Sequence, residues 1–245
     1  MSILISCETG GSEVPPFAAR LLRESETGTP ASDSRNEQSE WRGDSHALFA
    51  AERLSQLLTC PLIACQTSPQ LINVSRSLRH RELFSTRTRA WSEPARRELI
   101  EKIHEPFRQQ VQEKIVMMLN RFGSCFHLSV CTFESKHQNK YRRGDVGLAY
   151  ETGRREEVAF CLDWIDDLYD EMSMLKVRRN FPRRGNADSL TKSMRRHFLG
   201  RSYFGIEIQL NRQWASRNSS IRDNVLSGLA ESLSYVLQDS LRAAA

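Results

Sequence analysis

Several features that mark protein classes are missing from this sequence. No pair of its six cysteines has the C-x-x-C spacing of a zinc ribbon or a thioredoxin-type site. Six cysteines in 245 residues also fall short of a disulfide framework. No apolar stretch approaches the roughly 20 residues that a membrane-spanning helix needs. We therefore expect a chain that folds without disulfides and has no membrane partner.

Other absences concern location and nucleic acid. The N-terminus has neither a basic segment nor a long apolar one, so we expect no signal peptide and a cytoplasmic protein. The basic residues come in pairs and are not gathered in one block, and no aromatic platform accompanies them. These patterns argue against a nucleic-acid partner.

What remains is an ordinary globular composition with a slight basic excess. Hydrophobic residues make up 39% and charged residues 27% of the chain. Lys and Arg number 35 against 30 Asp and Glu, which gives a formal net charge of +5 and favours an anionic ligand. A chain of this length can bury most of its apolar surface, so we expect one domain over residues 1–245.

Apolar strand patterns alternate with helical ones. The predicted strands cover residues 2–6, 61–65, 71–74, 125–133, 146–150 and 203–210. The predicted helices begin at residues 16, 45, 92, 158 and 221, and Pro106 should interrupt the third. This order predicts a single three-layer α/β/α domain with a mixed, mostly parallel sheet. The strands at Ile3, 125–133 and 203–210 should be its central, adjacent members.

Polar residues follow several of these strands. Open α/β sheets bind ligands at the carboxyl ends of their strands, so we expect one crevice lined by Glu8, Thr9, Arg76, Cys131 and Glu207. A glutamate inside an apolar strand, as Glu207 is, needs a partner or a function. It is either a site residue or half of a buried ion pair. The segment 178–188 adds four arginines, whose guanidinium groups bind carboxylates bidentately.

These segments, in this order, resemble the N-formylglutamate amidohydrolase family. The matching stretches are SCETGGSEVP (6–15), DSHA (44–47), NVSRS (73–77), HEPFR (104–108), SVCTF (129–133), DVGLAY (145–150), RRNFPRRGNADSLT (178–191) and GIE (205–207). The resemblance implies a phosphorylase/hydrolase-like fold related to zinc carboxypeptidases. It also implies metal-dependent hydrolysis of an amide, typically of N-formyl-L-glutamate to formate and glutamate. In that chemistry a metal activates water and a carboxylate acts as the general base.

The resemblance also implies roles for individual residues. Glu207 would be the catalytic base. The ligand, a small acidic N-acyl amino acid or dicarboxylate, would be held by Arg76, Arg142, Arg179 and Arg184. Zinc would be held at the positions of Thr9, Glu40, Asp44 and Cys131.

The sequence departs from the family at several of these positions. Thr9, Glu40, Cys131 and Arg108 stand where family members have histidine. Carboxylates and thiolates are normal zinc donors, but a threonine hydroxyl is a poor one. We therefore expect weak zinc binding and low or absent amidase activity.

Some roles stay open at this point. Cys131 is either a ligand or a small buried residue, and Asp44 is either a ligand or a helix cap. His46, which replaces a family glycine, is either a compensating ligand or an exposed helix residue. Two functions follow. The chain is either an amidohydrolase with a rearranged metal site or an inactive binding or regulatory module for a small acidic ligand.

Overall fold

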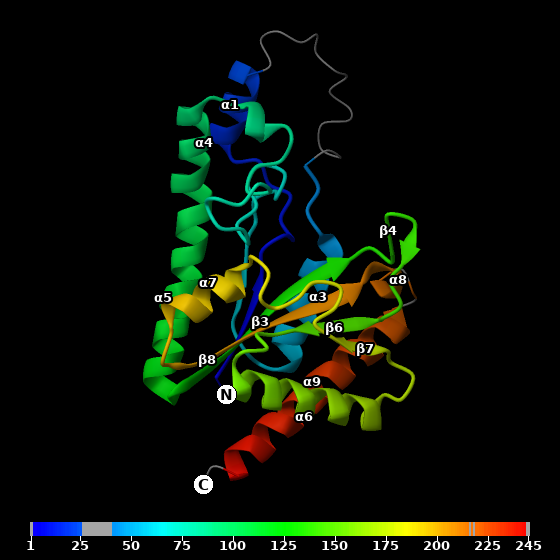
Figure 1. The fold of residues 1–245 in the computed structure, drawn as a ribbon. Helices are drawn as coiled ribbons and strands as arrows, with labels where there is room; N and C mark the ends of the chain where they lie inside the picture. The colour runs from blue at the N-terminus through cyan, green and yellow to red at the C-terminus, as the bar shows by residue number, and fades with distance from the viewer. Residues whose placement is uncertain (1, 26–40, 216, 218, 244–245) are drawn as a thin grey trace.

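A six-stranded sheet forms the centre of the structure (Figure 1). The computed structural model describes residues 2–25, 41–215, 217 and 219–243. In spatial order the strands are β2 (Leu62–Ala64), β1 (Ile3–Cys7), β3 (Ser124–Phe133), β8 (Ser202–Asn211), β6 (Val146–Ala149) and β7 (Val177–Arg179). The first four run parallel, β6 is antiparallel to β8, and β7 is parallel to β6.

The predicted sheet is confirmed. It is mixed and mostly parallel, and β1, β3 and β8 are adjacent, with β1 and β8 each having a second neighbour. Their mostly apolar sequences suit this place, because a strand covered by helices on both faces is buried on both sides. Ile3, Leu4 and Ile5, for example, are fully buried although successive residues point to opposite faces.

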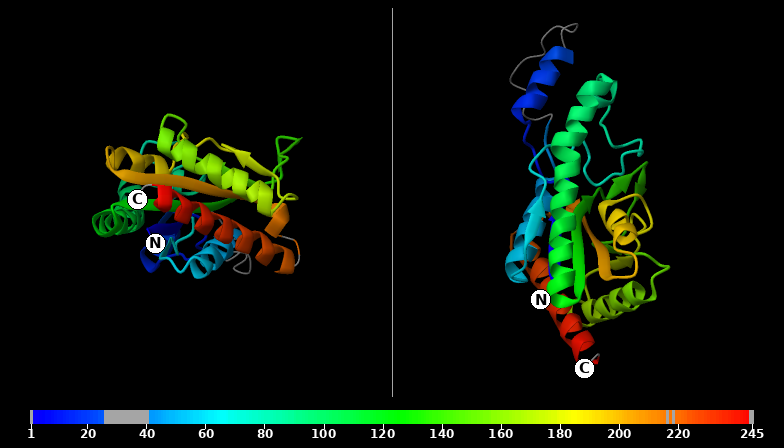
Figure 2. Two further views of the ribbon diagram at one scale, coloured as in Figure 1. Left: turned by 90° about the horizontal axis from the view of Figure 1, so that it is seen from below. Right: turned by 90° about the vertical axis from the view of Figure 1, so that its left-hand side faces the viewer.

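Helices cover both faces, as the side views show (Figure 2). One core lies under α3 (Ser45–Leu57), α6 (Arg155–Glu171) and α9 (Ser219–Ala243). The other lies under α1 (Pro16–Ser25), α4 (Glu93–Leu99), α5 (Glu105–Phe122) and α7 (Leu190–His197). The remaining elements are short: η1 (Thr88–Ala90), η2 (Ile100–His104), α8 (Arg212–Ala215) and the hairpin of β4 (Lys136–His137) and β5 (Lys140–Tyr141). The three-layer prediction is therefore confirmed.

The interruption of the long helix is also confirmed. A π-helical turn, η2, separates α4 from α5, and Pro106 lies in the first turn of α5. Proline is tolerated there because first-turn N–H groups have no partner within the helix.

The strand predicted at residues 71–74 is wrong. Leu71, Ile72 and Val74 are buried, but they belong to a turn segment packed in the second core. The backbone N–H of Asn73 donates to the carbonyl of Leu83, a loop residue. The apolar run therefore indicated burial and not a strand. Among the described residues, no helix has the length and apolar character to cross a membrane.

Arg195 in α7 corrects another expectation. The sequence pattern predicts a solvated helix face for Arg195 and Arg196, but Arg195 is only 5% exposed. Its Nε lies 3.0 Å from both carboxylate oxygens of Glu157, which is itself fully buried on α6. Its Nη1 donates to the Gly185 carbonyl at 3.0 Å, and its Nη2 donates to the Gly205 carbonyl. This ion pair therefore joins α7, α6, β8 and the loop before α7.

The replacement Glu157→Gln should destabilise the fold by about 3–5 kcal/mol, because it leaves Arg195 buried without a counter-charge. Chemical denaturation would measure the loss. The exposed neighbour Arg196 provides the control, since Arg196→Ala should change stability by no more than about 0.5 kcal/mol. Equal small effects of both replacements would contradict a stabilising role for the pair.

Candidate functional site

A cleft of about 790 Å³ opens at the carboxyl ends of β1, β3 and β8. Its lining includes four arginines and three carboxylates: Arg42, Arg142, Arg183 and Arg212 with Glu8, Asp44 and Glu134. Thr9, Cys131 and Gln209 also line it. The volume falls within the roughly 300–1,000 Å³ typical of small-molecule sites.

Glycine brings the segments on one side of the cleft together. A Cβ on Gly11 would lie 2.1 Å from the Gln66 carbonyl oxygen, and one on Gly43 would lie 1.9 Å from the Gly11 oxygen. Only glycine permits such close backbone approach. As a result, the N–H of Asp44 donates to the carbonyl of Thr9 at 2.7 Å, and the start of α3 sits against the end of β1.

Glu8, just after β1, is 3% exposed and accepts hydrogen bonds from hydroxyl groups. Ser6 Oγ donates to its Oε1 at 2.5 Å and Ser129 Oγ to its Oε2 at 2.7 Å. Burial raises the pKa of Glu8, and the two serine hydrogen bonds only partly oppose this. Ser6 Oγ also lies 2.7 Å from Nε2 of His127, whose Nδ1 lies 2.7 Å from the Tyr203 hydroxyl. A buried chain of hydrogen bonds thus leads from the cleft into the sheet.

Glu207 on β8 forms an ion pair with Arg183. Arg183 Nη2 lies 2.8 Å from Glu207 Oε2, and Gln209 Nε2 donates to the same oxygen at 3.1 Å. Thr191 Oγ1 donates to the other oxygen at 3.2 Å. Glu207 is 1% exposed. Burial alone would lower the pKa of Arg183, but the charge of Glu207, its hydrogen bond to Arg183 and the nearby Cys131 and Glu8 together outweigh burial and raise the pKa.

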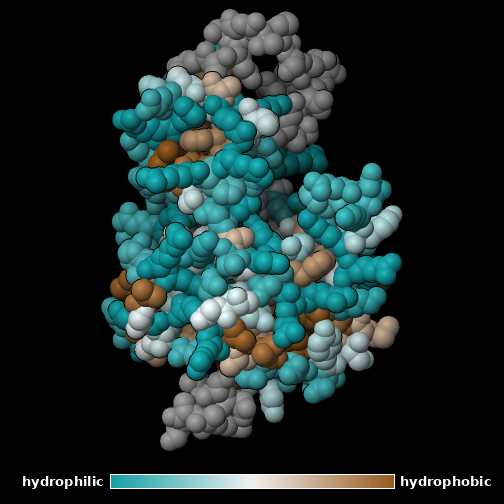
Figure 3. Space-filling view, viewed as in Figure 1, coloured by the Kyte–Doolittle hydropathy of each residue, from teal (hydrophilic) through white to brown (hydrophobic). Residues whose placement is uncertain are grey.

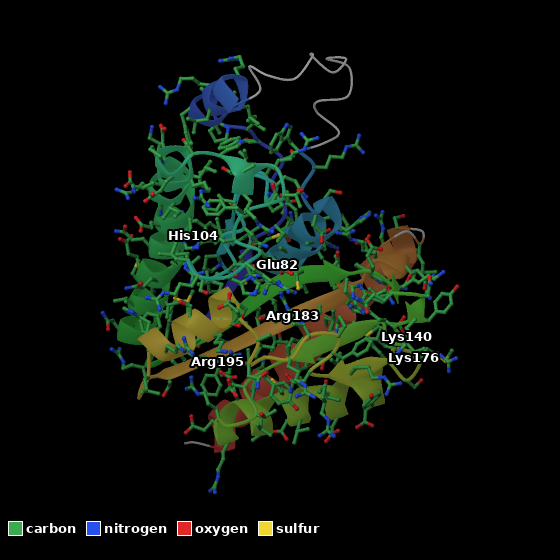
Figure 4. All side chains as sticks on the ribbon, turned by 45° about the horizontal axis from the view of Figure 1, so that its top comes forward. Glu82, His104, Lys140, Lys176, Arg183 and Arg195 are labelled. Carbon is green, nitrogen blue, oxygen red and sulfur yellow. The ribbon has the colours of Figure 1, made fainter. Side chains whose placement is uncertain are left out.

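Loop packing places Arg183 over the sheet, where Figure 4 shows it among the central strands. The loop crosses β6 at Gly147, where a Cβ would lie 1.7 Å from the Phe181 carbonyl oxygen. The Arg183 N–H also donates to Gln209 Oε1 at 3.3 Å, which fixes the loop to β8. Arg183 is therefore held over the carboxyl ends of β3 and β8.

A second carboxylate, that of Asp44, also forms an ion pair with an arginine. Its Oδ1 accepts from the Ala47 N–H at 3.1 Å, so the predicted helix-cap role is confirmed. Its Oδ2 accepts from Thr132 Oγ1 at 2.5 Å and lies 3.3 Å from Arg212 Nη2. Arg212 also contacts Glu134. Burial lowers the pKa of Arg212, but Asp44 and Glu134 outweigh it and raise the pKa above its usual value.

Cys131 lies in the cleft near Arg183, with 4.0 Å between its Sγ and Arg183 Nη2. Burial raises the pKa of this thiol to about 12, although Arg183 opposes the shift. The side chain is therefore a neutral thiol at physiological pH. A thiol in this state is a weak nucleophile, since the thiolate is the reactive form.

The structure brings together part of the predicted site. Glu8, Thr9, Asp44, Cys131 and Arg142 line the cleft, and Glu207 contacts the lining residue Arg183.

The other predicted site residues lie elsewhere. Arg76 is not among the lining residues: its guanidinium donates to the Asp188 carbonyl and lies 2.9 Å from a Glu82 carboxylate oxygen. Arg179 and Arg184 are exposed outside the cleft, and His46 is exposed on α3. Glu40 lies outside the described residues.

Solved structures identify the fold, although no protein-family model and no curated protein sequence matches the chain. Gene product Atu2144 from Agrobacterium tumefaciens superposes with a TM-score of 0.77 at 17% identity, covering 97% of this chain and 91% of that one. N-formylglutamate amidohydrolase from Ralstonia eutropha JMP134 superposes with a TM-score of 0.65 at 14% identity, covering 100% and 95%. The chain has the N-formylglutamate amidohydrolase fold.

This fold does not by itself determine the chemistry of the site, because one fold can host many functions. Zinc hydrolysis needs about three protein donors around an open coordination position. Here Asp44 is engaged by Arg212 and Thr132, and Glu207 by Arg183. Among the described residues, no group of three or more His, Cys, Asp or Glu side chains could hold a metal ion. The donor set therefore does not fit zinc.

Three arginines that line the cleft, Arg42, Arg183 and Arg212, are missing from the sequence prediction. Arg183 lies in the predicted arginine-rich segment, but the family resemblance selects its neighbours Arg179 and Arg184. Arg212 directly follows β8, at a strand end where ligand-binding residues are expected. The position of Arg212 directly after a central strand could therefore have identified it from the sequence. Arg183 could not be identified in this way, because its pairing with Glu207 depends on how its loop folds over the sheet.

Removing Arg183 should expose its electrostatic role. Arg183→Met leaves Glu207 buried without a cation and should cost about 3 kcal/mol in unfolding free energy. The double variant Arg183→Met/Glu207→Gln should recover part of this loss, because no buried charge is left unpaired. Chemical denaturation of the single and double variants measures the coupling. Additive effects of the two replacements would mean that the pair contributes nothing.

His127 should make stability depend on acidic pH. Burial, and after it the charge of Arg195, lowers the pKa of His127 to about 3 from its usual value of 6.5. Between these values the unfolded chain binds a proton that the folded chain does not, so stability falls as pH drops below about 6.5. The variant His127→Asn should show a shallower fall between about pH 6.5 and pH 4 in urea unfolding. Parallel curves of stability against pH for the unmodified protein and the variant would contradict the assignment of this pH dependence to His127.

Proposed function

We propose that this protein binds a small acidic ligand, an N-acyl amino acid or a dicarboxylate, in the cleft without a catalytic zinc ion. The observation that carries the proposal is the pairing of two carboxylates with internal cations: Asp44, which lines the cleft, and Glu207, which contacts the lining residue Arg183. Arg183 neutralises Glu207 and Arg212 neutralises Asp44. A guanidinium group supplies positive charge where hydrolysis would require a metal, but it cannot activate water as a metal does.

The two remaining arginines of the cleft favour an anionic ligand. Arg42 and Arg142 line the cleft, and neither forms a salt bridge with a carboxylate in the part of the chain that the structure describes. Guanidinium groups bind carboxylates through two parallel hydrogen bonds. A ligand carboxylate placed between them would complete the charge balance of the cleft. The raised pKa of Glu8 suits this ligand, because a carboxyl group that is harder to ionise repels an anion less.

A second candidate is metal-dependent hydrolysis of an N-acyl amide. It is favoured by the gathering of Asp44, Cys131 and Glu207 at one cleft in an amidohydrolase fold. In this alternative, zinc would be held by Asp44 and Cys131 beside Thr9, and Glu207 would be the base. Arg212 and Arg183 would first have to release the two carboxylates.

Calorimetric titration with N-formylglutamate, and with its dimethyl ester as an uncharged control, tests the binding proposal. Arg142→Ala should weaken N-formylglutamate binding about tenfold or more, since a hydrogen bond to a charged group contributes about 1.5–3 kcal/mol. Arg155→Ala, which removes an exposed arginine on α6, should leave binding unchanged. Equal affinity for the ester, or no binding at millimolar concentration, would contradict the proposal.

Metal analysis separates the two candidates. We expect substoichiometric zinc in the purified protein and no release of formate from N-formylglutamate when zinc is added. Stoichiometric zinc together with formate release that Glu207→Gln abolishes would instead establish the hydrolase.

A further inference from the structure

A row of basic side chains borders the cleft on the side of the β4–β5 hairpin. We call it the basic ridge, and it consists of Lys136, Lys140, Arg142, Arg143, Lys176 and Arg178. Arg142 is half-buried and the others are exposed. In Figure 3 the hairpin forms a hydrophilic projection on the right of the molecule, and Figure 4 shows Lys140 and Lys176 toward that edge.

Backbone contacts hold the two parts of the ridge together. The Arg142 N–H donates to the Ser135 carbonyl at 2.7 Å, which closes the base of the hairpin. Arg178 Nε, from β7, donates to the Arg143 carbonyl at 3.3 Å. The Lys176 N–H donates to Asp145 Oδ2 at 3.0 Å. The hairpin and the start of β7 therefore form one continuous surface.

The ridge has little internal charge compensation. Residues 135–145 and 176–178 contain one carboxylate, Asp145, which accepts from backbone N–H. Among the described residues, none of the six ridge cations forms a salt bridge. Elsewhere on the surface such pairs do occur, as between Arg97 and Glu93 or between Lys102 and Glu98. Unpaired like charges held close together attract a polyanion.

Arg142 belongs both to the ridge and to the lining of the cleft. A single acidic residue in the cleft would engage Arg142 and leave the other ridge cations without a partner. The C-terminal glutamate of a peptide is itself an N-acyl glutamate, in which the preceding residue supplies the acyl group. A peptide with such an end can therefore fill the cleft and extend further carboxylates along the ridge.

The chemistry of the surface favours a peptide over nucleic acid. Single-stranded nucleic acid binds by stacking its bases on several aromatic rings along a basic groove. The hairpin exposes two rings, the phenol of Tyr141 and the imidazole of His137, and Lys136 Nζ lies over Tyr141 at 5.8 Å from the centroid. A run of carboxylates needs only the cations.

We propose that the basic ridge binds the acidic C-terminal segment of a peptide whose last residue, a glutamate or aspartate, occupies the cleft. This inference rests on the proposed binding function of the cleft and names its ligand class.

Fluorescence anisotropy of the full chain with an N-terminally labelled hexaglutamate peptide tests the proposal. We expect this peptide to bind at least tenfold more tightly than N-formylglutamate, and its affinity to fall with added salt. Amidation of its C-terminal carboxylate should weaken binding, and a hexaglutamine peptide should not bind. The double variant Lys136→Ala/Lys140→Ala should lower the peptide affinity about tenfold and leave the dissociation constant of N-formylglutamate unchanged.

The matched control removes two exposed arginines elsewhere, Arg121→Ala/Arg155→Ala, and should change neither affinity. Binding of N-formylglutamate without tighter binding of the peptide would overturn this inference and leave the proposed function standing. If neither N-formylglutamate nor the peptide binds, both this inference and the proposed function are overturned. A single-stranded oligonucleotide of equal charge that binds as tightly as the peptide would show a nonspecific polyanion surface and would also overturn it. A loss of peptide affinity in the control variant would do the same.

Discussion

The ion pair between Arg183 and Glu207 determines what the cleft can do. Glu207 lies on a central strand with 1% of its surface exposed, so its charge requires compensation where it stands. A metal site would use such a carboxylate as a ligand or a base. Here a guanidinium group from the loop over β6 takes up one of its oxygens at 2.8 Å. The cation is covalently part of the chain, so the charge of Glu207 is compensated before any ligand arrives.

Asp44 is likewise neutralised by an arginine of the chain, and it also caps a helix. One oxygen caps α3 and the other is shared between Thr132 and Arg212. Releasing Asp44 to a metal would therefore cost a helix cap, a short hydrogen bond and an ion pair together. The two arginines are mutually independent, one from the loop before α7 and the other from the residue after β8. Neutralisation from two separate segments makes the arrangement robust, because rearranging one does not free the other carboxylate.

The sequence predicted the sheet well because its central strands are buried on both faces and are therefore mostly apolar. The same criterion failed at residues 71–74, where burial under helices produces an apolar run without strand pairing. The sequence placed residues in the cleft correctly where they lie at the end of a central strand, as Glu8 and Cys131 do. It failed for Arg183 and Arg195, whose partners lie 24 and 38 residues away in the chain. Two adjacent arginines, such as Arg195 and Arg196, look alike in sequence, and only the packing of α7 decides which one is buried.

The cations of the protein fall into a group that forms internal ion pairs and a group that is available to an external anion. The cations Arg183, Arg195 and Arg212 are held by carboxylates of this chain, and their attraction is already satisfied. The cations of the hairpin and of β7 are solvated, and they have no such partner within the described residues. This second group, together with Arg42 in the cleft, can offer net attraction to an external anion, because a paired guanidinium must first lose its internal partner. Arg142 belongs to the ridge and also lines the cleft. In the proposed binding mode, selectivity for acidic ligands would come from Arg42 and Arg142, which form no salt bridge within the described residues, while the ion-paired arginines would fix the shape of the cleft.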